Sequence, residues 1–300
     1  MRILRTFEEL AGDICLAIGV FDGVHLGHQR VIGQARDDAK ADGGVSVVLT
    51  FDPHPMRVLR PDQAPLLLTS TEHKLALFRQ LGADACLLVT FDKTFSELPA
   101  DRFIERIASC RQVCVGTRFR FGHDRAGNVA LMEKLAPQYG FTVKEIKSVL
   151  TSDGEMVSST AVRQHVLAGN LDRAAAMLGR PFSVLGSVEH GDHRGHELGF
   201  PTANVNPHNE ALPPDGVYAV RVRLGDTRLA GVVNIGLRPT FAGTAHRLEV
   251  HILDFDRGLY GQDIEIEFTM KLRNERKFAS ADELKAQIAA DVQAARQALG

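Results

Sequence analysis

The chain has 300 residues, of which 44% are hydrophobic and 24% charged, values that are ordinary for a globular protein with room for two domains. A formal net charge of −2 argues against generic nucleic-acid binding, so an anionic ligand must be held by local clusters. No apolar run approaches the roughly 18 residues of a membrane span, and Glu8 and Glu9 interrupt any secretory segment. We therefore expect a cytoplasmic protein that does not enter a membrane.

The four cysteines are expected to be structural. Cys15 and Cys86 lie inside apolar runs, which favours burial in a core. Cys110 and Cys114 are four residues apart, but no second pair stands near them and the local run is typical of a strand. Burial is therefore a better interpretation than a zinc site.

The first informative stretch covers residues 14–32. An apolar run over 14–20 predicts a buried strand, and Val31, Ile32 and Ala35 recur at helical spacing. Between them lies a turn of small and polar residues. A strand that breaks into a helix in this way leaves backbone N–H groups and a positive dipole end facing outward, which suits a phosphate group.

Two histidines stand in that turn, separated by Leu26 and Gly27. Gly27 lets the backbone approach a ligand, and the imidazoles of His25 and His28 can donate to a leaving pyrophosphate as it gains charge. Two solvated capping histidines are the alternative. His-x-Gly-His directly after a buried strand favours the phosphate site.

The segment from Gly19 to His28 resembles the signature of the HxGH nucleotidyltransferase superfamily. Its Phe-Asp-Gly-Val-His form is similar to the bacterial bifunctional riboflavin kinase/FMN adenylyltransferases, also called FAD synthetases. The resemblance implies that His25 and His28 are catalytic. It also implies that the nucleotide is contacted by Gly19, Phe21, Asp22 and Gly23.

Alternating strands and helices follow. Apolar runs at 45–50, 85–90 and 112–115 predict strands, and 74–81 and 100–108 have helical patterns. This alternation predicts an α/β domain with a doubly wound parallel sheet. The sequence has no Gly-x-x-x-x-Gly-Lys-Ser/Thr run, which excludes a P-loop.

Two further segments of this half resemble the family. Residues 50–55 are similar to its Thr-Phe-x-Pro-His-Pro segment, which implies a phosphate or nucleotide contact from His54; a plain rigid turn is the alternative. Residues 116–128 are similar to a glycine-rich aromatic segment of the family, which implies flavin contacts from Phe119, Phe121 and Arg125. A solvated loop is the alternative there. Arg118 stands where the family usually has Asp or Asn, so we expect a slower or altered adenylyl transfer.

A Ser-Ser-Thr run closes the first half. Ser158, Ser159 and Thr160 can cap a helix that begins near Thr160. The run through Arg163 resembles the family's Ser-Ser-Thr-x-Ile/Val-Arg motif, which implies that Ser159, Thr160 and Arg163 bind the triphosphate. After a short helix over 171–178, residues 179–182 have the composition of a linker, so we place the domains at 1–180 and 181–300.

The second half changes to short alternating runs at 216–224, 231–235, 248–253 and 264–268. Period-2 alternation at this spacing predicts an antiparallel barrel or sandwich, and we expect a small β-barrel. One helix closes the chain. Ser280 and Glu283 form a capping-box pattern, and Leu284, Ile288, Val292, Ala295 and Leu299 trace an apolar stripe.

Residues 198–204 resemble the Leu-Gly-Phe-Pro-Thr-Ala-Asn signature of riboflavin kinases, with His196 in place of an arginine usual just before it. The resemblance implies that Gly199, Pro201 and Thr202 contact the nucleotide. A hydroxyl and an amide oxygen at Thr202 and Asn204 can bind Mg²⁺ beside substrate phosphates. Without the resemblance, Thr-x-Asn is more typical of a strand surface.

Further matches to the kinases lie at 214–219, 231–241 and 272–278. Glu249 corresponds to the family's catalytic glutamate and is expected to accept a proton from a primary alcohol. Spacing alone leaves Asp254 and Glu275 open as alternative bases, and a solvent-facing carboxylate is the alternative for any one of them. The resemblance also implies flavin contacts from Asn234, Arg238, Arg273 and Glu275.

The whole pattern predicts an enzyme that phosphorylates riboflavin with ATP and Mg²⁺ and then transfers AMP from a second ATP to FMN. Its expected partners are riboflavin, FMN, FAD and ATP, with no nucleic acid and no membrane; the oligomeric state stays open. A riboflavin kinase whose first domain is impaired at Arg118 is the main alternative. A non-catalytic flavin- or RNA-binding barrel and a nucleotidyltransferase for another acceptor are the others.

Overall fold

The computed structural model describes residues 1–189, 199–240 and 243–300, together with the side chains outside 237–245. The sequence-based expectation for His196 therefore lies outside the described residues. Contacts divide the chain into two compact units. The first contains Met1–Pro65 and Thr71–Ser159, and the second contains Leu66–Ser70 and Thr160–Gly300.

The first unit is built on a sheet of six parallel strands in the order β1-β4-β3-β2-β5-β8. Its inner strands are those expected from the apolar runs, and the parallel sheet is confirmed. The edge strands β1 and β8 were not expected, because their residues are largely exposed or half-buried and give no apolar run. The strands are β1 (Arg2–Leu4), β2 (Ile14–Ile18), β3 (Val45–Asp52), β4 (Ala85–Thr90), β5 (Gln112–Gly116) and β8 (Thr142–Ile146).

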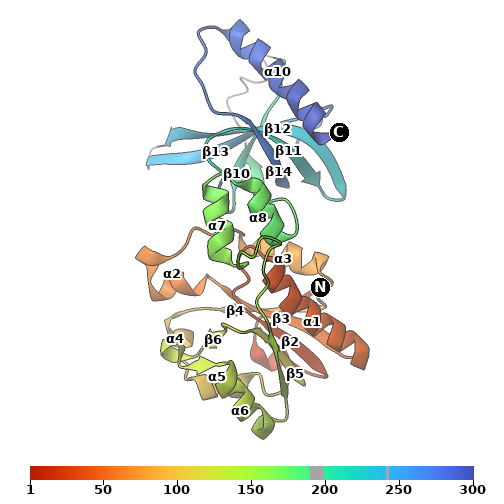
Figure 1. Cartoon of the computed structure of the whole chain (residues 1–300), viewed down its shortest axis with the longest axis vertical. Coiled ribbons are helices and arrows are strands. Elements are labelled where there is room, and N and C mark those ends of the chain that lie inside the picture. The colour runs from red at the N-terminus through yellow and green to blue at the C-terminus, as the bar shows by residue number, and fades with distance from the viewer. Residues whose placement is uncertain (190–198, 241–242) are drawn as a thin grey trace. The chain divides into compact units, whose positions relative to one another are not determined.

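Helices cover both faces of this sheet (Figure 1). Along β2, Leu16 and Ile18 point to the face covered by α5 (Ala100–Arg106) and α6 (Val129–Tyr139). Cys15 and Ala17 point to the opposite face, which packs against α1 (Leu26–Asp42) and α3 (Thr71–Gln80). Burial on both faces explains why the inner strands are continuous apolar runs.

Shorter elements connect these layers. The first unit also contains α2 (Pro55–Leu59), α4 (Lys93–Ser96), the two-stranded pair β6 (Arg120–Phe121) and β7 (Gly127–Asn128), and the 3-10 turns η1 (Phe7–Glu9), η2 (Pro61–Gln63) and η3 (His123–Arg125). α7 (Ser159–Leu167) begins one residue before the position expected, and α8 (Leu171–Leu178) has the expected bounds.

All four cysteines are buried free thiols, as predicted. Cys114 lies on β5, whereas Cys110 precedes this strand rather than lying on it. Burial raises the pKa of Cys86 and of Cys110 to about 12. It raises the pKa of Cys114 to about 11. These thiols therefore stay protonated near neutral pH and serve as small core residues.

The second unit contains a closed barrel of antiparallel strands, in the order β10-β13-β12-β11-β14-β9. A barrel is thus confirmed over a sandwich. Its interior is filled by alternate apolar side chains such as Val220, Val233, Leu248, Ile266 and Phe268. The strands are β9 (Ser183–Glu189), β10 (Ala203–Pro207), β11 (Gly216–Leu224), β12 (Thr227–Thr240), β13 (Gly243–Ile252) and β14 (Asp263–Arg273).

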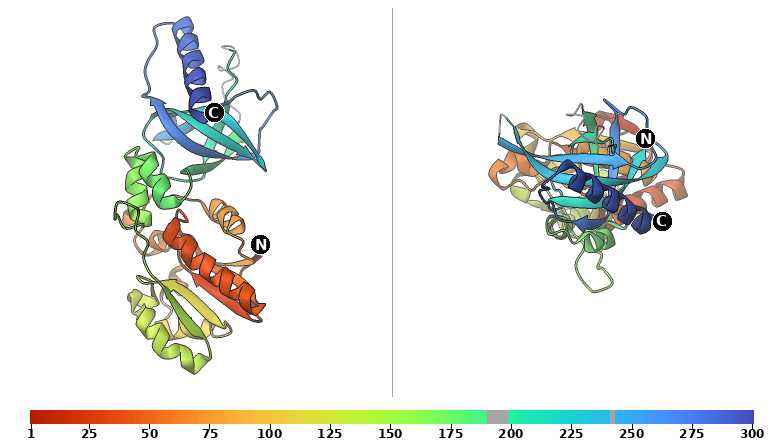
Figure 2. Two further views of the ribbon diagram at one scale, coloured as in Figure 1. Left: turned by 45° about the vertical axis from the view of Figure 1, so that its right-hand side comes forward. Right: turned by 90° about the horizontal axis from the view of Figure 1, so that it is seen from above.

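The closing helix α10 (Ala281–Leu299) packs on β11, β12 and β14 (Figure 2). Val292, Ala295 and Leu299 of its stripe form one apolar cluster with Val217 and Ala219 of the barrel's outer face. Ser280 caps the helix by accepting a hydrogen bond from the backbone N–H of Glu283. The Glu283 carboxylate accepts from the backbone N–H of Ala279, one residue before the position in the expected capping box.

No helix in the described part of the chain is both long enough and apolar enough to cross a bilayer.

Candidate active sites

The turn after β2 has an unusual backbone. Phe21 and Val24 have positive φ angles of 55° and 43°, and Gly23 has a φ of 80°. Such angles cost a non-glycine residue about 1–3 kcal/mol and are found most often at functional sites. The Phe21 ring folds back beneath the turn, where a Cβ on Gly19 would lie 2.8 Å from its Cε1 atom. Glycine at position 19 is therefore required by this packing.

The two histidines of the turn lie together at the start of α1. His25 is the N-cap residue, and its Nδ1 accepts a hydrogen bond from the backbone N–H of His28. The two imidazoles stack with their centroids 3.5 Å apart, and the Phe21 ring contacts His28 edge-on. His25 is only 7% exposed. The turn thus holds both rings in fixed orientations at a helix N-terminus.

Two further segments expected to bind the nucleotide are positioned by hydrogen bonds. His54 caps α2, and its Nδ1 accepts from the backbone N–H of Met56. The Ser159 hydroxyl donates to the backbone carbonyl of Asp22 at 2.8 Å. The structure therefore brings Ser159 to the His25–His28 turn. Thr160 and Arg163 belong by contacts to the second unit, where Arg163 Nε donates to the carbonyl of Leu66.

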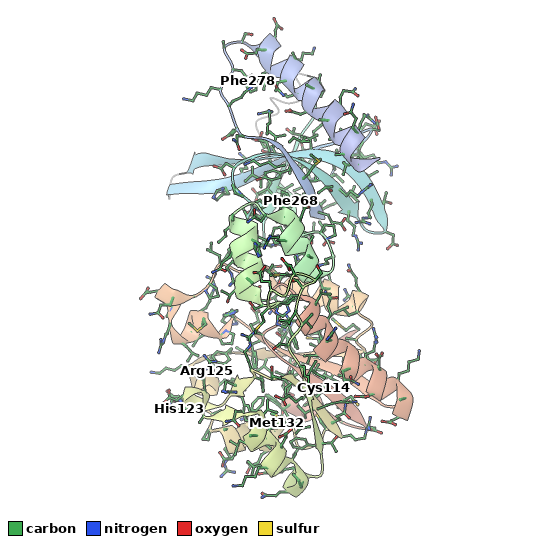
Figure 3. The ribbon with its side chains drawn as sticks, in the orientation of Figure 1. Cys114, His123, Arg125, Met132, Phe268 and Phe278 are labelled. Atoms are coloured by element: carbon green, nitrogen blue, oxygen red, sulfur yellow. The ribbon has the colours of Figure 1, made fainter. Side chains whose placement is uncertain are left out.

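A cavity of about 600 Å³ opens in the first unit. Arg60, Lys93, His123 and Arg125 bring positive charge or hydrogen-bond donors to it. Figure 3 labels two of them, His123 and Arg125. Its apolar lining is Met56, Val58, Leu59, Phe91, Phe95, Leu98 and Phe103. Two carboxylates, Glu97 and Asp124, line it as well, so the basic groups outnumber the acidic ones. A mainly apolar cavity with such a lining suits a planar aromatic ligand with an anionic tail.

Of the three aromatic-loop residues expected to bind flavin, Arg125 lines this cavity. Phe121 is 7% exposed and packs on Phe103, which does line it. Phe119 stacks on Phe121. Arg118 is exposed.

In the second unit, one row of paired residues crosses the barrel. Asn204 of β10 lies opposite Glu249 of β13, and Glu249 lies opposite Asn234 of β12. The row continues through Val217 of β11 to Arg273 of β14. Directly opposed residues project from the same face of a sheet. Val217 packs against α10, so this face is the outer one, toward the helix.

A cavity of about 350 Å³ lies on that face, between the barrel, α10 and the segment after β14. It gathers five of the residues expected at the kinase site from four separate parts of the chain, namely Thr202, Asn234, Glu249, Arg273 and Glu275. Apolar walls come from Phe200, Val232, Phe278 and Ile288. Figure 3 shows Phe278 on the segment between β14 and α10.

A neighbouring cavity of about 280 Å³ is lined by Pro201, Thr202, Arg257 and Tyr260 among others. Thr202 lines this cavity as well as the larger one. Asn204, one of the two candidate Mg²⁺ ligands, is 8% exposed. Two adjoining cavities with a hydroxyl between them are suited to a donor and an acceptor in a transfer reaction.

An ion pair fixes one wall of the larger cavity. The Arg273 guanidinium donates through Nε and Nη2 to the Asp291 carboxylate at 2.8–3.0 Å, and Asp291 is 5% exposed. Arg273 and Arg276 both lie over the Phe278 ring, at 5.6 and 4.8 Å from its centroid. These contacts orient the segment that carries Glu275.

The other residues expected at the kinase site lie in different surroundings. Asp254, one alternative base, is paired with Arg296, which lowers its pKa, and it does not line the larger cavity. Glu275, the other, does line it. Gly199 is exposed with a φ of 82°. Arg238 lies on β12, and its side chain is outside the described part of the structure.

The sequence analysis missed two buried charges beside the candidate sites, Lys74 on α3 and Asp291 on α10. Both stand on the apolar stripe of their helix, three residues from Leu77 and Ile288 respectively. A charged residue on a core-facing stripe is the signal that would have identified them.

Comparison with known proteins supports both halves. The family model described as FAD synthetase matches residues 8–161, and the one described as riboflavin kinase matches residues 178–299. A bifunctional riboflavin kinase/FMN adenylyltransferase of Escherichia coli (strain K12) is 42% identical, covering 100% of this chain and 98% of its own length. A protein of the same name from Bacillus subtilis (strain 168) is 38% identical, covering 96% and 93%.

The chain belongs to the family of bifunctional riboflavin kinase/FMN adenylyltransferases. This membership confirms the resemblance found in the sequence motifs. A solved structure from Streptococcus pneumoniae, described as a macrolide-efflux protein, is 29% identical with a TM-score of 0.83 over 98% of each chain. That similarity supports the fold of both units.

Proposed function

We propose that this chain makes FAD in two ATP-dependent steps. The barrel domain, which we place at residues 181–300, phosphorylates riboflavin to FMN. The parallel-sheet domain, which we place at residues 1–180, transfers AMP from ATP to FMN with release of pyrophosphate. The observation that carries the proposal is the row of paired residues across the barrel, because it brings Glu249, Asn234 and Arg273, which are distant in sequence, to one cavity. Asn204 stands beside Glu249 in the same row.

Glu249 is the proposed base of the kinase step. It is half-buried at the centre of that row and lines the larger cavity. A carboxylate there can accept the proton of the primary alcohol of riboflavin as its oxygen attacks the γ-phosphate. Asn234, Arg273 and Glu275 would hold the flavin, and the Asp291 pair would fix Arg273.

ATP would occupy the smaller cavity, with its phosphates near Pro201 and Thr202, which line it, and near Gly199, two residues before Pro201. Thr202 and Asn204 supply uncharged oxygen ligands, and the described residues form no cluster of three His, Cys, Asp or Glu side chains that could hold a metal alone. That donor set fits Mg²⁺ bound together with the phosphates of ATP rather than in a protein cage. When bound, the ion would neutralise charge on the β- and γ-phosphates.

In the adenylyl transfer, the phosphate of FMN is already a nucleophile and needs no general base. The proposed work of the first unit is to position the two substrates and to stabilise charge on the leaving pyrophosphate. His25, His28 and the N-terminus of α1 would contact the pyrophosphate, with His54 and Ser159 as further phosphate contacts. The flavin ring of FMN would occupy the cavity lined by Phe103 and Arg125.

The substrates of both steps are small molecules, namely riboflavin, FMN, FAD and ATP. We also propose a cytoplasmic location, supported by four free thiols, which are typical of a reducing compartment. A riboflavin kinase with an impaired first domain is not favoured, since relatives named for both activities match nearly the full chain.

Separate assays test the two steps. Purified full-length chain is given riboflavin with Mg-ATP, and in a second tube FMN with Mg-ATP, and products are resolved by chromatography. We expect FMN and then FAD in the first tube and FAD with pyrophosphate in the second. Glu249→Gln should strongly slow only the first step and His28→Ala only the second. Failure of the wild-type chain to form FMN would contradict the kinase assignment, and failure to form FAD would contradict the transferase assignment.

A further inference from the structure

Lys74 is a buried cation at the carboxyl edge of the parallel sheet. It lies in the first turn of α3 and is 5% exposed. Its Nζ donates to the backbone carbonyls of Phe51 at 3.3 Å and Val20 at 3.4 Å. Val20 follows β2 and leads into the turn that carries His25 and His28. Phe51 is near the end of β3 and leads to His54.

The same two strand ends are joined by other bonds. The Thr50 hydroxyl also donates to the Val20 carbonyl, at 3.0 Å, and the backbone N–H of Gly19 donates to Leu49. Lys74 is the charged member of this set. One ammonium group therefore contacts both segments that are expected to face the phosphates of ATP.

Titratable groups from four elements act on Lys74. Asp22 lies on the turn after β2, Asp52 at the end of β3 and Glu72 on α3 itself, and the fourth is the thiol of Cys86 on β4. Burial is the largest influence and lowers the pKa of Lys74 from its ordinary 10.5, while these groups oppose the shift. Burying an ammonium group is costly compared with a leucine or methionine at the same stripe position. Packing of α3 alone does not require the charge.

We propose that Lys74 is a positioning residue for adenylyl transfer, whose ammonium group holds the His25–His28 turn and the His54 turn at a fixed spacing. The proposal rests on the function proposed above for those turns. Without the ammonium, the carbonyls of Val20 and Phe51 lose a shared donor and the two turns can separate. The FMN phosphate and the leaving pyrophosphate are then no longer held at once, which lowers kcat more than it raises KM.

The test uses the full chain with Lys74→Met and Lys74→Arg, and Lys40→Met as a matched control because Lys40 is an exposed lysine of the same unit. FAD formation from FMN is measured along with riboflavin phosphorylation in the same preparation. We expect Lys74→Met to lower kcat for FAD formation about 10–100-fold, as a lost positioning contact does. Riboflavin phosphorylation and the Lys40→Met control should stay within about twofold of wild type.

A pH profile separates positioning by charge from a purely structural role. The wild-type rate of FAD formation should fall at alkaline pH as Lys74 loses its proton. Lys74→Arg should recover part of the activity and move that alkaline limb to higher pH, because guanidinium keeps its proton. If Lys74→Met does not fold, the comparison of wild type with Lys74→Arg decides alone.

Two results would overturn the proposal: a Lys74→Met variant that forms FAD at the wild-type rate, or alkaline limbs that coincide in wild type and Lys74→Arg. Both results are interpreted relative to a wild-type chain that converts FMN to FAD. Absence of that conversion in wild type would instead refute the proposed function of the first unit.

Discussion

The imidazole rings of His25 and His28 lie face to face, with centroids 3.5 Å apart and 19° between their planes. Because His25 Nδ1 accepts the backbone N–H of His28, that nitrogen carries no proton while the bond stands. The ring nitrogen that His25 can offer to a ligand is therefore Nε2. We expect the stacked His28 ring to offer a second nitrogen, so that a phosphate would meet two imidazoles at one helix N-terminus.

His28→Ala should remove one of these donors. We expect FAD formation from FMN to fall by about 10²–10³-fold, the usual cost of losing a donor that stabilises a developing charge. Riboflavin phosphorylation should be unchanged, since it is assigned to the other unit. Steady-state kinetics of both reactions on one preparation provides the measurement and its control. An equal loss of both activities would argue against the assignment.

Glu249→Gln should have the opposite pattern. The amide keeps the size of the side chain but cannot accept the alcohol proton, so we expect riboflavin phosphorylation to fall by about 10²–10⁴-fold. FAD formation from supplied FMN should be unaffected. Asp226→Asn, at the exposed tip between β11 and β12, is the matched carboxylate-to-amide control and should leave both rates unchanged. A fully active Glu249→Gln chain would direct attention to Glu275.

The strong periodic segments were predictable because burial dictates them. β4, β11 and α8 have the bounds read from the sequence, and the barrel and parallel sheet are confirmed. For the site, the sequence showed the separate motifs but not how they come together. Strand register places Glu249 opposite both Asn204 and Asn234, and it pairs residues up to 45 positions apart. Local sequence does not contain that register.

Partners of single side chains were equally hidden. The sequence places Arg273 in a family motif. It does not reveal that the hydrogen bonds donated by Arg273 are accepted by Asp291, which lies on α10, 18 residues further along the chain. Phe121 looks available to a flavin in the sequence, whereas its ring is buried against Phe103. Both outcomes depend on tertiary packing of separate elements, so composition and periodicity do not determine them.

Gly122→Ala should destabilise the first unit. Gly122 has a φ of 73°, and an added Cβ would lie 2.7 Å from the Cα and N atoms of Ala100. We expect a loss of about 2–4 kcal/mol in the free energy of unfolding, from backbone strain plus overpacking. Gly140→Ala is the control, since its φ is 78° but nothing lies within 4 Å of an added Cβ. Urea denaturation that gives equal losses for both variants would exclude the clash.

The buried thiols predict a dependence on pH. Cys86 and Cys110 keep their protons in the folded chain up to a pKa of about 12, against 9.0 for an ordinary thiol. Between pH 9 and 12 the folded state therefore binds more protons than the unfolded state. The free energy of unfolding consequently falls as the pH rises through this range. At pH 8 we expect slow reaction with a thiol reagent in buffer and fast reaction in urea. Rapid labelling of four thiols in buffer would contradict the burial.

Arg118→Asp tests the departure from the family's usual residue. Arg118 is exposed on the loop that leads to β6, so a change of charge there should not disturb the core. We expect faster adenylyl transfer to FMN, with riboflavin phosphorylation unchanged as the control. Identical rates in the wild type and the variant would show that the arginine does not limit this step.

The most direct measurement is a time course of products from riboflavin and Mg-ATP, followed by chromatography with the purified full-length chain. We expect FMN to appear first and then to decline as FAD accumulates, with pyrophosphate released in step with FAD. Formation of neither flavin nucleotide, or of FMN that never becomes FAD, would contradict the claim that one chain carries both phosphate-transfer sites.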